Sequence, residues 1–559
     1  MPALIKRDVP VRISLFIFSA LSLTLIVGLP MLAMLMFAIF PNFNELSFAA
    51  PFSKFPELVA DNGLLEAIFN SLRLAITVTL LSALISVPLG YFRSQMSNRI
   101  GHVWDVLFLL PFLIPPYIGS LSWMQLLQRN GFLEQFFGFN LSNFLFSFLG
   151  LATVMALHLF PLIYFTVSKS FSVVGARYSE VAQLFGGKRL AVFFKIDLPM
   201  VLPALLGSSL LVFILTIEEF GTPEILGRRF GFEVMVTAIH DKFSNWPIDL
   251  SAAAVLSLIL VLIAFAAYRL QLAVSNRHST AVENQKLIFN AKQRPLVTQL
   301  LINTLFCAVS LIAVLLPIFS ILASAFMERI SMGLVWSNIG TSNFRQLFSD
   351  ESEGAIAIWT SLGLAGGAAI ATAIIGLIVV FTIVRLRPRG SQFLDFLSIL
   401  PNSIPGMAIA VGLILVWNLS IWPLTPYNTV WILLLAYLCL MLPYPIRMIT
   451  SALQQLPKSL DEAAYISGAN EWRVIFKILT PLLLPISFAA GLIVFAISTR
   501  ELVSSLMLAP PGVETVATFV FRQFDQGDIN VGMAMSLLVI LISGSIIAIG
   551  QRLQGRLQS

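Results

Sequence analysis

Charged residues are scarce in this chain of 559 residues. Only 11% of its residues are Asp, Glu, Lys or Arg, whereas about 25% is usual for a soluble domain. Hydrophobic residues make up 58% of the chain, and the mean hydropathy is +0.90. This composition excludes an ordinary soluble domain and indicates a protein that crosses a membrane several times.

Cysteine and histidine are also rare. The two cysteines, Cys307 and Cys439, lie far apart within predicted membrane helices, and the four histidines are scattered. We therefore expect neither a disulfide framework nor a thiolate metal site. No grouping of Ser, His and Asp resembles a catalytic constellation, so the sequence predicts a protein that is not an enzyme.

A phosphate-binding loop is missing as well. The stretch Gly186-Gly187-Lys188-Arg189 contains the Gly-Lys pair of such loops, but Ala182 stands where the first glycine is needed. Arg189 replaces the Ser or Thr that follows the lysine. This stretch therefore does not predict a nucleotide site, and we expect this chain to bind no cofactor.

Long apolar runs are what the chain has in abundance. Each run is close to the roughly 20 residues that a helix needs to cross a bilayer. They predict an all-α polytopic membrane protein of about 12 spans in two groups of six: 13–40, 67–92, 104–127, 146–168, 198–217 and 249–272, then 297–326, 355–384, 394–418, 428–450, 482–499 and 531–550.

The distribution of basic residues predicts the topology. If the N-terminus is inside, most of the 34 lysines and arginines fall in inside loops or at inside helix ends. We therefore expect both termini in the cytoplasm, with the lipid bilayer as the surroundings of the spans. The net charge of +6 then reflects topology, and we expect no nucleic-acid partner.

One polar loop occurs twice, at an offset of 282 residues. The copies are EVAQLFGGKRLAVFFKIDLP, from Glu180, and SLDEAAYISGANEWRVIFKILTP, from Ser459. A repeat at this distance indicates two homologous halves. We predict a first half over 1–275 with its loop at 177–199, a cytoplasmic linker over 276–296, and a second half over 297–559 with its loop at 459–481.

Each loop is predicted to form two short helices joined by a sharp turn. In the second copy, Ser459 and Glu462 have the spacing of a capping box, and Gly468 can take the left-handed conformation that ends a helix. Pro481 is suited to the first turn of the next membrane helix. The first copy has Arg177 at the cap position, so its helix start is less well specified.

The third span of each half is interrupted by prolines. The first half has Pro111, Pro115 and Pro116 in LPFLIPPYIG, and the second has Pro401 and Pro405 in LPNSIPGMAI. Proline breaks or kinks a helix because it removes a backbone donor. A packing kink and a break that lines a transport pathway are both open readings, since matched breaks in two halves are typical of transporters.

The repeated loop resembles the EAA loop of membrane subunits of binding-protein-dependent ABC importers. This resemblance implies the type I ABC importer permease fold and a bacterial inner membrane location. It also implies two copies of an ABC ATPase subunit, which carry ATP and Mg, and a periplasmic binding protein. The positions that would contact or shape the ATPase interface are Glu180, Ala182, Gly186, Ile196, Pro199, Glu462, Ala463, Ala464, Gly468, Ile478 and Pro481. Val181 and Thr480 depart from the pattern.

The layout is similar to that of ferric iron permeases of Gram-negative bacteria, which favours iron(III) as the substrate. Thiamine, an organophosphonate and a sugar phosphate stay open, because permeases for such substrates share this layout. Glu218, Glu219 and Glu501 lie at matched ends of the fifth spans and offer hard oxygen ligands, and Arg500 lies beside them. The plainer reading is solvated charge at helix ends.

A rival from another class is an ion-coupled secondary transporter, which also uses repeats and broken helices. It predicts ionisable relays deep in the membrane, and few such residues occur in the apolar runs.

Overall fold

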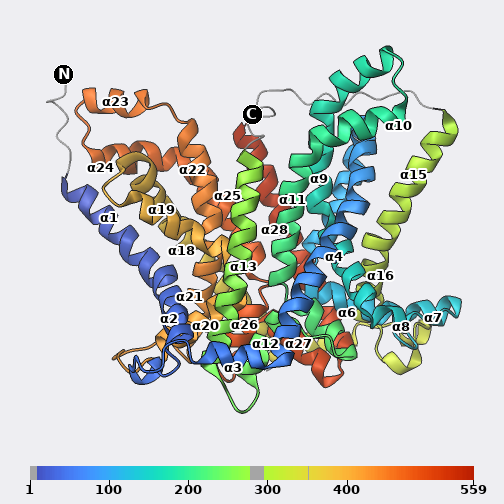
Figure 1. Ribbon diagram of the computed structural model, residues 1–559, viewed down its shortest axis with the longest axis horizontal. Helices are drawn as coiled ribbons and strands as arrows, with labels where there is room; N and C mark the ends of the chain where they lie inside the picture. Colours follow the sequence, from blue (N-terminus) through green and yellow to red (C-terminus); the bar gives the residue numbers. More distant parts are fainter. Residues whose placement is uncertain (1–8, 277–294, 350–351, 559) are drawn as a thin grey trace. The chain divides into compact units, whose positions relative to one another are not determined.

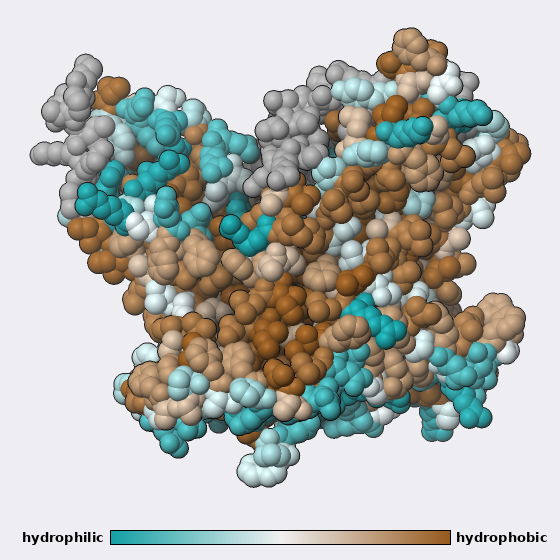
Figure 2. Space-filling view, viewed as in Figure 1, coloured by the Kyte–Doolittle hydropathy of each residue, from teal (hydrophilic) through white to brown (hydrophobic). Residues whose placement is uncertain are grey.

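The computed structural model describes residues 9–276, 295–349 and 352–558, and this part of the chain is built from helices (Figure 1). Its only β pairing is an isolated bridge between Met327 and Ile339. Nine described helices are long and apolar enough to cross a membrane, and three bent helix pairs raise the number to as many as 12. The prediction of an all-α polytopic protein is confirmed. Figure 2 shows hydrophobic surface over the long helices and hydrophilic residues near their ends.

The chain divides into two compact units that do not follow the two sequence halves. Unit 1 comprises Met1–Glu57, Lys242–Val261 and Phe344–Ser559, and unit 2 comprises Leu58–Asp241 and Leu262–Asn343. The first helix of each half is therefore part of the unit formed mainly by the other half. Most of the predicted linker, 277–294, lies outside the described residues, and the boundaries of the halves stay a prediction.

Unit 2 is organised around α4, which packs along α9 and against α11. Ser82 and Ser86 of α4 donate hydrogen bonds to the carbonyl oxygens of Ala156 (3.4 Å) and Phe160 (2.8 Å) of α9. The helices of unit 2 are α4 (Asn62–Arg93), α5 (Asn98–Leu113), α6 (Pro116–Leu127), α7 (Phe132–Phe137), α8 (Ser142–Leu145), α9 (Phe148–Leu184), α10 (Arg189–Val192), α11 (Leu198–Glu218), α12 (Met235–Ser244), α15 (Leu296–Ser310) and α16 (Leu316–Phe326).

Unit 1 repeats this plan, with α18 packed against α22 and α25, and α25 against α28. Four helices have residues in both units: α3 (Lys54–Ala60), α12, α13 (Leu250–Asn276) and α17 (Ser342–Leu347). The other helices of unit 1 are α1 (Val9–Leu23), α2 (Leu29–Ile39), α18 (Glu353–Val380), α19 (Ser391–Ile399), α20 (Gly406–Trp417), α21 (Val430–Met441), α22 (Pro443–Gln455), α23 (Ser459–Ile466), α24 (Glu471–Arg473), α25 (Thr480–Ser498), α26 (Val503–Leu508), α27 (Val516–Gln526) and α28 (Ile529–Gln558).

The first helix of each half packs closely on the broken third span within its unit. In unit 1, α2 contacts α20, where Gly412 is so near the Pro30 carbonyl that a Cβ atom would lie 2.5 Å from its oxygen. In unit 2, α16 contacts α6, and Ser320 donates a 2.7 Å hydrogen bond to the Ser122 carbonyl oxygen. Small residues permit these close approaches in both units.

The predicted proline breaks are confirmed in both halves. The chain bends by 97° between α5 and α6. In the second half, α19 and the 3₁₀ turn that follows it are bent by 117° relative to α20. The short segments after the breaks are the most buried in their units: ten of the twelve residues of α6 are buried, and ten of the twelve of α20. Protein thus surrounds the backbone groups freed at the breaks, as lipid requires.

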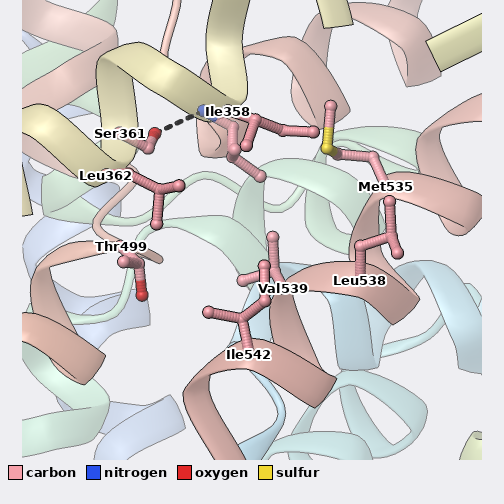
Figure 3. Close-up of a pocket in the computed structure, with 9 residues that line it drawn as sticks. Ile358, Ser361, Leu362, Thr499, Met535, Leu538, Val539 and Ile542 are labelled. Carbon is pink, nitrogen blue, oxygen red and sulfur yellow. Dashed lines mark hydrogen bonds between the residues drawn. The ribbon is translucent and has the colours of Figure 1, made fainter. Parts of the chain in front are cut away.

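A buried serine holds a short helix after the fifth span in each unit. The Oγ atom of Ser71 on α4 accepts a 2.8 Å hydrogen bond from the backbone N–H of Met235, the first residue of α12. Ser361 on α18 accepts the equivalent bond, 2.7 Å, from Val516 at the start of α27 (Figure 3). Each serine thus serves an N–H group that has no partner within its own helix.

Replacing either serine by alanine leaves a buried N–H group without an acceptor. We expect Ser71→Ala and Ser361→Ala each to lower the free energy of unfolding by about 1–3 kcal/mol, measured as a lower thermal midpoint of the purified protein in detergent. The control is Thr360→Ala, because that hydroxyl bonds only to the carbonyl of Ile356 in its own helix. Equal effects of Thr360→Ala and Ser361→Ala would contradict this account.

Candidate functional site

The two repeated loops contain the same glycine turn. Gly186 has φ +86° and Gly468 has φ +84°, the left-handed conformation predicted for both. In the first loop (residues 177–199), the N–H groups of Gly186 and Gly187 donate to the carbonyls of Gln183 and Ala182, at 3.0 and 2.9 Å.

The second loop (residues 459–481) repeats these bonds at an offset of 282 residues. Gly468 donates to Tyr465 and Ala469 to Ala464, both at 3.0 Å. This pair of bonds is the Schellman motif that ends a helix, so the backbone geometry of the two turns is matched.

An aliphatic side chain stands out of each turn, two residues before its glycine. Leu184 is 85% exposed and Ile466 is 88% exposed, and they are equivalent at the repeat offset. Glu462 and Ala463 are exposed as well, whereas Ala464 is buried beneath them. The side chain of Glu180 lies outside the described residues. Each loop thus presents an apolar side chain on a glycine turn of the same geometry.

The capping-box prediction for the second loop is wrong. Helix α23 begins at Ser459, but its N-cap is Lys458, and no side chain caps it. Because the N–H groups of Asp461 and Glu462 donate to the Lys458 carbonyl, Ser459 already has helical geometry and cannot act as the cap.

The prediction of separate short helices is also wrong in part. In the first loop no helix starts near Arg177, because α9 runs without interruption from Phe148 to Leu184. In each loop the second helix, α10 or α24, continues directly into the fifth span. These helices belong to the continuous helical stretches Arg189–Glu218 and Glu471–Ser498. Pro199 and Pro481 lie in the first turns of α11 and α25, inside these continuous stretches, so Pro481 does not open the helical stretch as predicted. Ile196 and Ile478 are half-buried in the π-helical turns that follow α10 and α24.

The second loop is fixed to membrane helices by two ion pairs. Arg12 of α1 contacts Glu471 at the start of α24, with its Nη2 atom 2.5 Å from Oε1. Arg385, at the end of the π-helical turn η9 (Phe381–Leu386), lies 3.5 Å from Asp461 of α23. Burial raises the pKa of Asp461, and Arg385 opposes this change.

The first loop has a different support. Ser179 of α9 donates a short hydrogen bond to Asp197, a buried residue at the end of the π-helical turn η3 (Phe193–Asp197). Further down α9, the Tyr164 hydroxyl donates a 2.8 Å hydrogen bond to Asp105, which also binds Arg93 at 2.7 Å. The first loop is therefore braced internally and through α9.

Glu219 and Glu501 are equivalent residues with the same contact. The Glu219 carboxylate accepts a hydrogen bond from the backbone N–H of Thr222, at 3.0 and 3.1 Å from its two oxygens. Glu501 accepts from the N–H and the hydroxyl of Ser504, both at 3.0 Å. Each carboxylate thus serves the backbone where the chain leaves the fifth span. They are half-buried rather than freely solvated.

The neighbouring charges differ between the halves. Glu218 ends α11, and its buried Oε1 atom has no hydrogen-bond partner in the described part of the chain. Arg500 is half-buried at the equivalent place after α25. Within the described ranges, no group of three or more His, Cys, Asp or Glu side chains is close enough together to hold a metal ion.

The proline-broken span of the first half borders a pocket. A small pocket in unit 2 is lined by Pro111 and Pro116 at the break, His158 of α9 and Thr222, which accepts a 2.8 Å hydrogen bond from Ser120. Pro115, Pro401 and Pro405 are buried. A second pocket, in unit 1, is apolar and lies between α18, α27 and α28; its lining includes Ile358, Leu362, Met535, Leu538 and Val539 (Figure 3).

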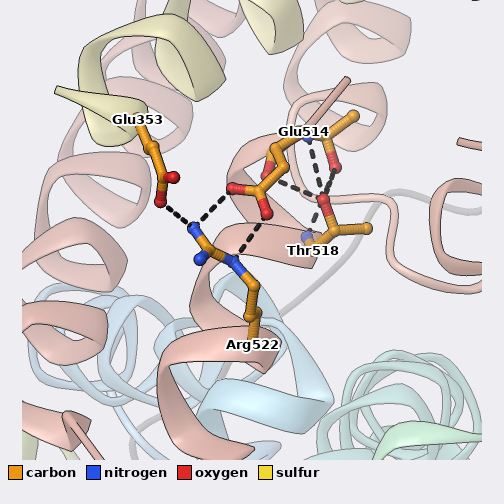
Figure 4. Close-up of polar contacts among 5 residues, drawn as sticks. Glu353, Glu514, Thr518 and Arg522 are labelled. Atoms are coloured by element: carbon orange, nitrogen blue, oxygen red, sulfur yellow. Dashed lines mark hydrogen bonds and ion pairs between the residues drawn. The ribbon is translucent and has the colours of Figure 1, made fainter. Parts of the chain in front are cut away.

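A surface ion cluster holds α27 in place. Arg522 of α27 lies between Glu353, at the start of α18, and Glu514, at 2.5 and 2.6 Å (Figure 4). The corresponding helix α12 carries Asp241, which pairs with Arg228. Both helices thus carry an ion-paired side chain, which is acidic in α12 and basic in α27.

Several of these supporting residues could not be found from local patterns. Arg12 and Glu471 are 459 residues apart, and no motif joins them. Ser71 and Ser361 stand at equivalent places in the second spans of the two halves, but only the structure shows which N–H groups they serve.

Comparison with known proteins gives a consistent picture. The chain is 25% identical over 500 residues to the "Ferric transport system permease protein FbpB" of Actinobacillus pleuropneumoniae, covering 87% of this chain and 70% of that protein. It is 25% identical over 498 residues to the "Fe(3+)-transport system permease protein FbpB 2" of Haemophilus influenzae, covering 87% and 90%. The "Putrescine transport system permease protein PotI" of Escherichia coli is 29% identical over 222 residues, covering 39% and 76%.

The family model described as "Binding-protein-dependent transport system inner membrane component" matches the chain twice, over residues 82–279 and 374–559. Each match contains one of the two glycine turns. Together they cover more than half of the chain, which therefore belongs to the family of inner membrane components of binding-protein-dependent transport systems.

Proposed function

We propose that this protein is the permease subunit of an ATP-driven importer, and that its two loops dock separate ATPase subunits. The observation that carries this proposal is the matched pair of glycine turns, each presenting one exposed aliphatic side chain, Leu184 or Ile466. Two equivalent turns suit two copies of one partner. ATP and Mg would be bound by that partner, because this sequence has no phosphate-binding loop.

The proposed orientation places the loops and both termini in the cytoplasm and the opposite ends of the spans toward a periplasmic binding protein. The basic residues support this arrangement, since most of them fall on the side of the two loops. The contact positions are those of the EAA pattern, Glu180 and Glu462 among them.

We propose ferric iron as the substrate. Two relatives that cover most of this chain are named for ferric or Fe(3+) transport. Thiamine, an organophosphonate, a sugar phosphate and a polyamine are the other outcomes that an uptake test must distinguish, since a putrescine permease also matches about two fifths of the chain.

In this proposal Glu218, Glu219 and Glu501 form an acidic pathway that iron contacts transiently, and Arg500 tempers its charge. Carboxylate oxygens suit a hard ferric ion. Glu219 and Glu501 already accept backbone hydrogen bonds, so each would offer only its remaining lone pairs. Pro111, Pro115, Pro401 and Pro405 create the breaks beside which this pathway would run.

The coupling role is tested by Gly468→Pro. Proline fixes φ near −65° and lacks the N–H that Gly468 donates to Tyr465, so the turn cannot form. We expect uptake of radioactive iron to fall to background while the protein still inserts in the membrane, as shown by immunoblotting of membranes. Gly138→Pro is the matched control, because Gly138 also has a positive φ, +71°, and lies outside both loops. Normal uptake by Gly468→Pro would refute the proposal.

The acidic pathway is tested by the double variant Glu219→Gln with Glu501→Gln. Glutamine keeps an oxygen that can accept the N–H of Thr222 or Ser504 but loses the charge. We expect iron uptake and iron-limited growth to fall by about ten-fold or more, the scale on which loss of a metal's partners acts. If uptake survives in this variant and fails only in Glu219→Ala with Glu501→Ala, the carboxylates serve the backbone alone.

A further inference from the structure

The second loop is joined to the first membrane helix by a closely fitted ion pair. The Nε atom of Arg12 donates to both carboxylate oxygens of Glu471, at 2.9 and 2.7 Å, and Nη2 donates to Oε1 at 2.5 Å. The Glu471 side chain is 3% exposed and that of Arg12 is 30% exposed. A guanidinium that binds both oxygens of a carboxylate fixes orientation as well as distance.

Further contacts connect α1, η9 and the start of the second loop. Ser19 of α1 lies 3.0 Å from the Thr382 hydroxyl in η9, one turn before Arg385. Arg385 pairs with Asp461 and also donates a 3.2 Å hydrogen bond to the Leu456 carbonyl, just before α23. Beneath these polar contacts, one apolar cluster packs α1, η9 and both arms of the loop together; it includes Leu15, Phe381, Ala464 and Ile475.

The residues equivalent to Arg12, Glu471 and Asp461 are different in the first half. Helices α1 and α15 correspond at an offset of 287 residues, so Gln299 stands in the place of Arg12. At the loop offset of 282, Arg189 stands in the place of Glu471, and Ser179 in that of Asp461. Gln299 and Arg189 therefore cannot form the ion pair that Arg12 and Glu471 form in the second half.

Stability alone is a weak explanation for such a pair. Removing two charges from water costs about as much as their attraction returns, and apolar replacements often stabilise a protein equally well. Buried pairs are better attested as devices that fix register. Here the register that is fixed is that of α24 on α1.

We propose that Arg12 is a positioning residue that makes the second loop and the first membrane helix move as one body, whereas the first loop lacks this ion pair to its counterpart helix. This inference rests on the proposed coupling role of the loops. Force applied at Ile466 then passes directly into α1, and force applied at Leu184 passes along α9.

Hydrogen exchange on the purified full-length protein tests the pair itself, without any partner. In Arg12→Gln we expect the amides of 468–474 to exchange roughly ten-fold faster, because a broken buried pair loosens its segment. Amides 185–187 of the first loop serve as an internal reference and should not change. The matched control Gln299→Ala, at the equivalent position of α15, should leave both loops unchanged. The exchanged pair Arg12→Glu with Glu471→Arg should restore protection.

Three outcomes would each overturn the proposal: unchanged hydrogen exchange in Arg12→Gln, an equal effect of Gln299→Ala, or a failure of the exchanged pair to restore protection. Function is then measured in the intact transporter complex. Arg12→Gln should lower substrate uptake several-fold per ATP hydrolysed while the ATPase subunits stay bound, and Arg12→Lys, which keeps the charge without the fork, should lie between. If Arg12→Gln takes up as much substrate per ATP hydrolysed as the unaltered protein, the proposal is also overturned. Normal uptake by Gly468→Pro would refute the coupling role separately.

Discussion

The need to satisfy backbone polar groups without water governs this structure. Where the membrane helices break, protein atoms take up the freed groups: α6 and α20 are buried after their proline breaks, and the carboxylates of Glu219 and Glu501 accept N–H groups where the fifth spans end. Ser71 and Ser361 do the same for α12 and α27. In a bilayer each such group left unpaired costs several kcal/mol, so breaks occur only where side chains can meet them.

The two halves satisfy these backbone N–H groups in equivalent ways. The glycine turns, the serine contacts and the carboxylate contacts all recur at nearly constant offsets. Side-chain charges follow no such rule. Asp241 and Arg522 occupy equivalent positions with opposite charge, and Arg12 has only Gln299 as its counterpart. An ion pair can be replaced by another pair or by apolar packing at little net cost, whereas a backbone donor always needs an acceptor.

The same distinction explains how much the sequence could predict. Apolar runs, proline breaks and glycine turns are local, and the spans, the bends after Leu113 and Ser403, and the φ angles of Gly186 and Gly468 agree with the sequence-based expectations. The capping box at Ser459 failed although it is local, because Lys458 is the N-cap and Ser459 is already the first helical residue. Arg12 with Glu471 depends on packing between segments 459 residues apart, and no periodicity encodes it.

The first helix of each half belongs to the unit formed mainly by the other half. This arrangement determines which helices move with each loop. Helix α1 belongs by sequence to the first half, yet it packs on α18 and α19 and holds the loop of the second half. Helix α15 packs on α4 and α5 but carries no charged residue at the position of Arg12. A displacement of the second loop is thus shared with a helix of the other half of the sequence, through a bond that resists both rotation and translation. A displacement of the first loop is instead passed to helices of its own half: α9, α11 and, through Tyr91 against Phe193, α4.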